Sequence, residues 1–226
     1  MISPPPQGEG GVARRAPPGW GMAELVTRYL ALGDSYTIGT GASSSAHSWP
    51  SIIAERLRNQ TGQKVELTNP AVNGFTTLDL IREELPEVRR LKPDLVTILI
   101  GVNDLVRERT PADYRASLVR IYDEVKKESA PDGRVFAVSI PNWSVVPAAR
   151  EYGDPEQIRH LTDTFNDIAQ EEAVERDFGW IDITAASLSG LGTPDWIASD
   201  GLHPGDNQYA AWAEVIWHSV REMPKP

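Results

Sequence analysis

The sequence predicts a single-domain α/β fold, with a doubly wound parallel five-stranded sheet and helices on both faces. Five short apolar runs alternate along the chain with five longer segments of helical periodicity. The run at 94–100 is almost continuously apolar, as expected of a central strand buried on both faces. The chain has 226 residues, of which 40% are hydrophobic and 24% charged, which suits one domain with a full core.

In the first half, residues 29–32 form an apolar run that ends in Gly33-Asp34-Ser35. A helical pattern follows at about 48–59, and residues 64–68 alternate as a short strand. Turn residues at 69–74 precede a helix that begins near Thr76 or Thr77 and continues to about residue 90. The strand at 94–100 then stops at glycine, in Gly101-Val102-Asn103-Asp104.

In the second half, Pro111 opens a helix to about residue 129 whose apolar residues form one stripe. After a turn at 131–133, residues 134–140 form the fourth strand. The apolar loop at 142–154 suits either a rim over a pocket or packing on the surface. A helix at 155–177, a strand at 179–183, an irregular segment at 184–199 and a helix at 206–220 complete the chain. Right-handed crossovers in this order favour a flavodoxin-like layout.

Composition excludes several classes of protein. The chain carries 22 basic and 32 acidic residues, a net charge of −10, which argues against nucleic acid and anionic membranes as partners. It has no cysteine, and no apolar run approaches the ~20 residues needed to span a bilayer. Residues 1–25 are rich in Pro and Gly and lack the apolar core of a secretory signal. We expect a disordered leader at 1–25, a domain at 26–222 and a cytoplasmic location; the oligomeric state stays open.

Ser35 lies where the first strand stops, at the edge where open α/β sheets bind ligands. Gly39 and Gly41 follow it and are expected to keep this backbone loose. Near the C-terminus, Asp200 precedes His203 by three residues and can fold back to accept the imidazole Nδ1–H. Ser35, His203 and Asp200 would then supply the nucleophile, the base and the group that orients the base. The N–H groups of Ser35 and Gly74 and the amide of Asn103 are candidate donors to an oxyanion.

These pieces, in this order, resemble the SGNH hydrolases, also called GDSL-like lipases and esterases. The matching residues are Gly33-Asp34-Ser35, Asn73-Gly74, Gly101 to Asp104, and Asp200 to Pro204, and they span nearly the whole folded chain. The resemblance implies that Ser35, Asp200 and His203 are the catalytic triad and that Ser35, Gly74 and Asn103 form the oxyanion hole. It also implies a cofactor-free hydrolase of acyl esters, in a family of which some members act on thioesters, lysophospholipids or acetylated sugars. We expect the substrate to be a small-molecule acyl ester. Tyr36 departs from the motif that names the family, which has Leu at this position.

The leading hypothesis is therefore a serine ester hydrolase that works through an acyl-enzyme, with a preference for short acyl chains. An acyltransferase on the same site and a non-catalytic binding module of the same fold are alternatives. A nucleotide binder is disfavoured because the phosphate-binding glycine motifs are absent. No group of Asp, Glu and His residues has metal-ligand spacing. Asp34 and Asp104 are interpreted as turn or supporting residues, and His47 as a surface residue.

Overall fold

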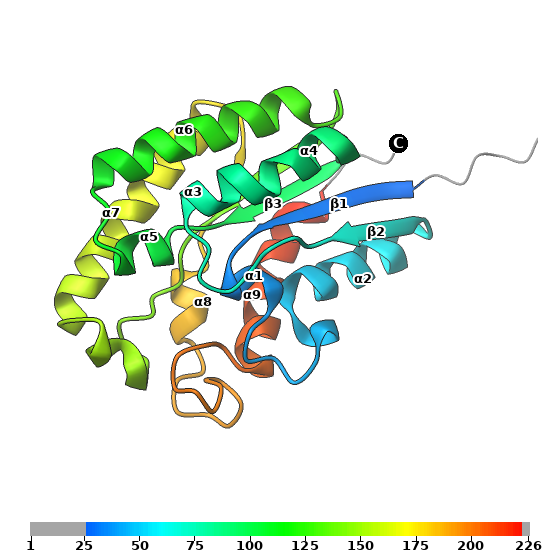
Figure 1. Ribbon diagram of the computed structural model, residues 1–226. Helices are drawn as coiled ribbons and strands as arrows, with labels where there is room; N and C mark the ends of the chain where they lie inside the picture. Colours follow the sequence, from blue (N-terminus) through cyan, green and yellow to red (C-terminus); the bar gives the residue numbers. More distant parts are fainter. Residues whose placement is uncertain (1–25, 223–226) are drawn as a thin grey trace, which may run out of the picture.

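A five-stranded parallel sheet forms the centre of the computed structural model, which describes residues 26–222 (Figure 1). Its strands are β1 (Val26–Gly33), β2 (Lys64–Thr68), β3 (Leu95–Leu99), β4 (Arg134–Val138) and β5 (Gly179–Ile181). They lie in the order β2-β1-β3-β4-β5, and each neighbouring pair is parallel. The prediction of a doubly wound parallel α/β sheet is confirmed. The leader predicted at 1–25 lies outside the described residues, so the domain boundaries stay predictions.

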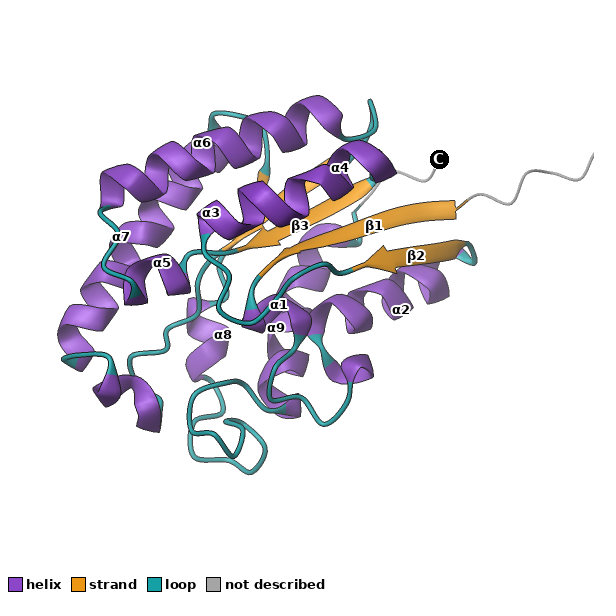
Figure 2. Cartoon of the chain, in the orientation of Figure 1, coloured by secondary structure: helices purple, strands orange, loops and turns teal. Residues whose placement is uncertain are grey.

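Helices cover both faces of this sheet (Figures 1 and 2). On one face lie α2 (Trp49–Thr61) and α9 (Asp206–Val220), which pack on each other. On the other face lie α6 (Pro111–Glu128), α7 (Pro155–Val174) and the helix formed by α3 (Thr77–Asp79), η2 (Leu80–Glu84) and α4 (Leu85–Leu91). The long helices begin and end within a few residues of their predicted limits because proline, capping residues and apolar stripes define them.

The strand order places β1 between β2 and β3. The chain therefore leaves β1 on one side, forms β2, and returns past β1 to form β3. Ligands of open α/β sheets bind at the carboxyl ends of the strands where this reversal occurs. Residues that follow β1, β2 and β3 meet at this edge, and they include Ser35, Gly74 and Asn103.

Short helices follow two of these strands and were not predicted. They are α1 (Ser35–Ile38) and α5 (Val102–Val106), and each is too short to show a periodic apolar pattern. The prediction that residues 184–199 are irregular throughout is wrong at its start, where α8 (Thr184–Leu188) forms. Two short 3₁₀ helices, η1 (Ser45–His47) and η3 (Pro147–Glu151), lie in the loops.

The helix predicted from Thr76 or Thr77 to residue 90 is present, but its hydrogen-bonding pattern changes in the middle. Its middle turn, η2, is a π-helix in which the Leu85 N–H donates to the Leu80 carbonyl. Pro86 has no N–H and its ring crowds the preceding turn, so a wider turn before it relieves the clash. This π turn brings Glu84 into the protein interior, where the side chain is fully buried.

In the described part of the chain, no helix is long and apolar enough to cross a membrane.

Candidate active site

Ser35 is the first residue of α1 and is almost completely buried, with 6% of its surface exposed. Asp34 caps this short helix, and its Oδ1 accepts the Tyr36 N–H at 3.0 Å. The Thr37 and Ile38 N–H groups both donate to the Asp34 carbonyl at 3.0 Å. The turn that carries Ser35 is thus held by both the side chain and the backbone of Asp34.

His203 and Asp200 form a close pair on the loop before α9. The His203 Nδ1 lies 2.6 Å from Asp200 Oδ2, and Asp200 Oδ1 accepts the backbone N–H groups of Leu202 and His203 at 2.9 and 3.0 Å. Partial burial would raise the pKa of Asp200, but these hydrogen bonds outweigh it and lower the pKa below its ordinary value. A carboxylate in this position orients the imidazole and leaves its Nε2 free.

The loop that holds His203 packs directly against the loop after Ser35. Gly41 has φ +91°, and a Cβ placed there would lie 2.5 Å from the Pro204 carbonyl oxygen and 3.1 Å from the His203 Cβ. The expectation that Gly41 keeps the backbone loose is therefore wrong, because this glycine allows a tight contact. Tyr209 adds a second tie, since its hydroxyl donates to the Thr40 carbonyl at 2.7 Å.

The other two candidate oxyanion donors, Gly74 and Asn103, come from the segments after β2 and β3. Gly74 has φ +80°, and its carbonyl accepts a 2.9 Å hydrogen bond from Arg107. The Asn103 Nδ2, in α5, donates to the Phe75 carbonyl at 2.9 Å and lies 3.4 Å from Asp34 Oδ2. The first bond uses one amide hydrogen, and the second contact is long, so one hydrogen is only weakly held.

One cavity of about 100 Å³ brings Ser35, Asn103 and His203 together. The other lining residues are mostly apolar or aromatic: Tyr36, Val102, Val106, Trp143, Tyr152 and Leu202. The Trp143 and Tyr152 rings meet edge to face, 5.7 Å apart, which supports the rim interpretation of the 142–154 loop. Gly74 does not line this cavity, and Asp200 contacts it only through His203.

Three buried carboxyl groups lie next to the segments that form this cavity. Asp34 and Asp104 are the chain neighbours of Ser35 and Asn103, and Glu84 accepts the Gly33 N–H. Burial raises the pKa of Asp34 to about 7, the Tyr36 N–H opposes this shift, and the Asp104 charge adds to it. Burial also raises the pKa of Asp104, although Thr77 and Arg109 counteract it. Burial raises the pKa of Glu84 to about 8, despite the hydrogen bond from Gly33. The sequence suggested a supporting role for Asp34 and Asp104 but gave no indication of Glu84.

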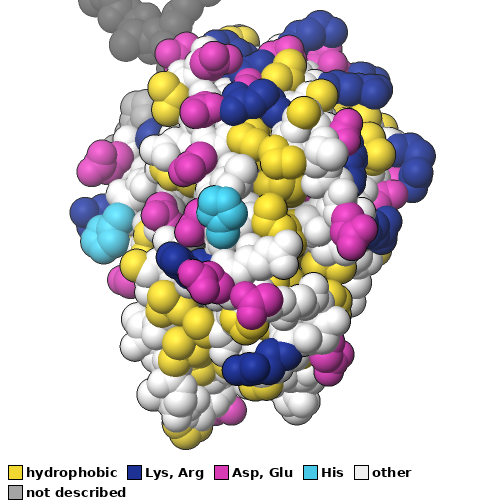
Figure 3. Space-filling view, turned by 90° about the vertical axis from the view of Figure 1, so that its left-hand side faces the viewer, with side chains coloured by type: hydrophobic (Ala, Val, Ile, Leu, Met, Phe, Trp, Pro, Cys, Tyr) yellow, Lys and Arg dark blue, Asp and Glu magenta, His cyan; other side chains and the backbone are white. Residues whose placement is uncertain are grey.

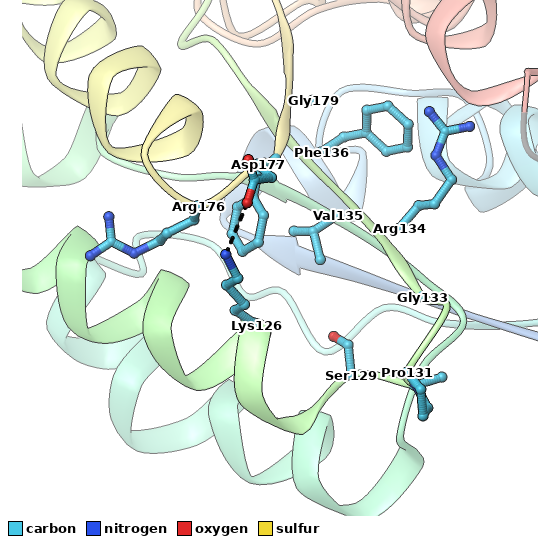
Figure 4. Close-up of a pocket in the computed structure, with 12 residues that line it drawn as sticks. Lys126, Ser129, Pro131, Gly133, Arg134, Val135, Phe136, Arg176, Asp177 and Gly179 are labelled. Atoms are coloured by element: carbon cyan, nitrogen blue, oxygen red, sulfur yellow. Dashed lines mark hydrogen bonds and ion pairs between the residues drawn. The ribbon is translucent and has the colours of Figure 1, made fainter.

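His47 and the cavity between Lys126 and Asp177 lie outside this site. His47 is exposed and lies beside Ser43 and Asp206 on the surface. No group of three His, Asp or Glu side chains within residues 26–222 could hold a metal ion. A cavity of about 340 Å³ lies at the opposite edge of the sheet, where β4 and β5 begin, and a 3.2 Å Lys126–Asp177 ion pair borders it (Figure 4).

Acidic, basic and apolar side chains are interspersed on the face shown in Figure 3. A histidine side chain lies near the middle of this face, with acidic side chains beside it (Figure 3). The mixed surface gives no single charge that would select a strongly charged substrate on this side.

Comparison with known proteins identifies the class of this α/β protein. The sequence profile of the GDSL-like lipase/acylhydrolase family matches residues 31–211. The chain belongs to this family, and it is a carboxylic ester hydrolase.

Relatives of known name agree with this assignment. An arylesterase of Vibrio mimicus is 26% identical over 189 residues, which cover 84% of this chain and 86% of the relative. Esterase TesA of Pseudomonas aeruginosa is 23% identical over 198 residues, which cover 86% of this chain and 88% of TesA.

Solved structures share the fold. The crystal structure of TesA superposes with a TM-score of 0.68 at 20% identity. The match covers 88% of this chain and 100% of the TesA chain. A variant of Axe2, an acetyl xylan esterase from Geobacillus stearothermophilus, gives a TM-score of 0.69 at 20% identity. The match covers 86% of this chain and 94% of the Axe2 chain.

Proposed function

We propose that this chain hydrolyses small esters with short acyl groups through a covalent acyl-enzyme on Ser35. The observation that carries the proposal is the 2.6 Å His203–Asp200 contact at a cavity that also contains Ser35 and Asn103. A serine hydroxyl needs a base, the base needs an orienting group, and the developing oxyanion needs donors. The described residues offer a candidate for each task.

In the proposed reaction, the Ser35 Oγ attacks the ester carbonyl while the His203 Nε2 takes its proton. Asp200 accepts the Nδ1–H and stabilises the imidazolium that forms. The oxyanion receives hydrogen bonds from the Ser35 and Gly74 N–H groups and from the weakly held hydrogen of the Asn103 amide. The tetrahedral intermediate collapses, His203 protonates the leaving alcohol, and a water activated by His203 then releases the acid.

Cavity size supports a short acyl group. The cavity beside Ser35 measures about 100 Å³, and the bulky side chains of Tyr36, Trp143 and Tyr152 line it. This volume suits an acyl group of a few heavy atoms. The Axe2 enzyme named above is an acetyl xylan esterase, and it makes acetylated sugars natural candidates for the substrate panel.

A second hollow suits the alcohol portion of the ester. It measures about 420 Å³ and is open to solvent between the loops at 38–45 and 72–73. Its lining includes the polar side chains of Thr40, Ser44, Ser45 and Asn73. Asn73 directly precedes Gly74, so this hollow adjoins the proposed oxyanion hole. Hydroxyl and amide groups here can bind the hydroxyls of a sugar.

The test is a hydrolysis panel of p-nitrophenyl esters from acetate to palmitate, together with acetylated sugars. We expect kcat/KM to be highest for the shortest acyl groups and to disappear in Ser35→Ala. An organophosphate should label wild type once, at Ser35, and leave Ser35→Ala unlabelled. Labelling at another serine, or higher kcat/KM for palmitate than for butyrate, would contradict the proposal.

The same panel separates the alternatives. Acceptor alcohols added to the reaction reveal an acyltransferase, because new esters then replace the free acid among the products. A folded protein without hydrolysis and without Ser35 labelling would instead support a binding module.

A further inference from the structure

Glu84 is a buried acid for which the proposed reaction has no direct use. Its side chain is fully buried, and one carboxyl oxygen, Oε1, has no hydrogen-bond partner among the described residues. The other oxygen, Oε2, accepts the backbone N–H of Gly33 at 2.9 Å. Gly33 is the last residue of β1 and stands two positions before Ser35. A buried carboxyl group with so few partners is costly, so its presence needs an explanation.

The hydrogen bond from Gly33 replaces one that the sheet does not provide. The register of β1 with β2 ends at Leu30 and Thr68, three residues before the end of β1. On the β3 side, pairing continues to Gly33 and Leu99. Glu84 therefore secures the end of β1 beyond its last contact with β2, directly before the turn that carries Ser35.

The helix that contains Glu84 follows the Gly74 loop of the proposed oxyanion hole along the chain. It begins at Thr77, three residues after Gly74. Its first turn is tied to α5, because Asp104 accepts both the backbone N–H and the hydroxyl of Thr77, at 2.8 and 2.5 Å. The helix is thus connected to α5 at Thr77 and to β1 at Glu84, about two turns further along.

We infer that Glu84 is a positioning residue that, as a neutral acid, fixes the Ser35 turn relative to the Gly74 loop and α5. This inference rests on the proposed function. A carboxylic acid keeps an acceptor for the Gly33 N–H, whereas a carboxylate would add a buried negative charge beneath the nucleophile.

The surrounding charges favour the neutral form. Asp34, from the β1–α1 turn, is the described charged group that acts on Glu84, and its negative charge opposes ionisation. The charge of Asp104, from α5, helps to raise the pKa of Asp34. Arg109 lies 3.4 Å from Asp104. Burial and Asp34 together raise the pKa of Glu84 to about 8. Ionisation above this pH would make Glu84 and Asp34 repel each other, and Asp34 holds the Tyr36 N–H beside Ser35.

The experiment compares Glu84→Gln, Glu84→Leu and the control Glu83→Gln, which changes an exposed acid on the same helix. Glu84→Gln keeps an oxygen acceptor and has no charge at any pH, whereas Glu84→Leu removes the acceptor. The measurements are kcat and KM on the best p-nitrophenyl ester between about pH 6 and 9.5, the rate of organophosphate labelling of Ser35, and the melting temperature.

We expect folded Glu84→Leu to lose at least about tenfold in kcat with KM little changed, and Glu84→Gln to stay within about threefold at neutral pH. Wild type and Glu83→Gln should lose activity and labelling rate above about pH 8. Glu84→Gln should lack this alkaline loss. A merely structural role for Glu84 would lower the melting temperature without removing the alkaline loss.

Two results would overturn the inference. One is a folded Glu84→Leu with kcat within about threefold of wild type, and the other is an unchanged alkaline loss in Glu84→Gln. If Glu84→Leu does not fold, the pH profile of Glu84→Gln decides. Labelling of wild type at Ser35 tests the proposed function separately, so failure of either idea can be recognised.

Discussion

The contact between Gly41 and the His203 loop allows the effect of Gly41→Ala on kcat to be predicted. The new methyl group would lie 2.5 Å from the Pro204 carbonyl oxygen and 2.8 Å from the Ala198 Cβ. The first contact is about 0.9 Å shorter than the 3.4 Å at which ordinary contact begins. A backbone carbonyl cannot rotate away as a flexible side chain can, so the Gly41 loop and the loop that carries His203 must move apart.

The size of the effect follows from this displacement. A misplacement of about 1 Å in a catalytic group lowers the rate by about 10²-fold. We therefore expect Gly41→Ala to lose roughly 100-fold in kcat. Stability should fall as well, because a non-glycine residue at positive φ costs about 1–2 kcal/mol and overpacking adds about 1–3 kcal/mol.

Gly62→Ala is the matched control. Gly62 ends α2 with φ +68°, and a Cβ there meets nothing within 4 Å. This variant carries the backbone strain without the collision and should keep its kcat. The assay measures kcat, KM and melting temperature of both variants on the same ester. If Gly41→Ala kept kcat within about threefold of wild type, far from the expected 100-fold loss, the loop contact would not position His203.

Two further predictions concern Asn103 and Glu84. Asn103→Ala should lower kcat by about 10²–10³ with little change in KM, because its amide donates to an oxygen that gains charge only in the transition state; a folded variant with near-normal kcat would remove Asn103 from the site. For Glu84, burial raises the folded pKa from 4.5 to about 8, so the unfolded chain releases this proton first and stability falls as pH rises through this window. Relative to Glu84→Gln, the free energy of unfolding of wild type should fall by about 1.4 kcal/mol per pH unit, measured by urea denaturation at several pH values; a constant difference would show that Glu84 ionises normally.

The sheet and the residues at its carboxyl edge could be predicted because local patterns encode them. Apolar runs that stop at Gly33 and Gly101 marked the strand ends, and parallel strands bring their carboxyl ends to one edge. The spacing of Asp200 and His203 predicted a contact within one turn, and the 2.6 Å distance confirms that contact. The roles of these residues in catalysis stay predictions.

Features that depend on packing between distant segments could not be predicted. Gly41 looked like a flexible linker because its partners, Ala198 and Pro204, lie more than 150 residues away in the sequence. The burial of Glu84 was not predicted, because a regular helix gives no reason to bury an acid at this position. Pro86 was the available signal, since a proline inside a helical segment favours a local change in hydrogen bonding.

The strand order explains why residues outside the cavity are expected to control it. Ser35, Gly74 and Asn103 follow three different strands, so their relative positions depend on how far each strand end projects beyond the sheet. The sheet fixes β1 against β3 up to Gly33 and Leu99 but releases β1 from β2 earlier. The bonds of Asn103 to Phe75, of Asp104 to Thr77 and of Glu84 to Gly33 supply the missing constraints. Each of these bonds has an end on the helix at 77–91 or the segment before it. We therefore expect substitutions along the inner face of this helix to change kcat more than KM, although none of them would touch the substrate.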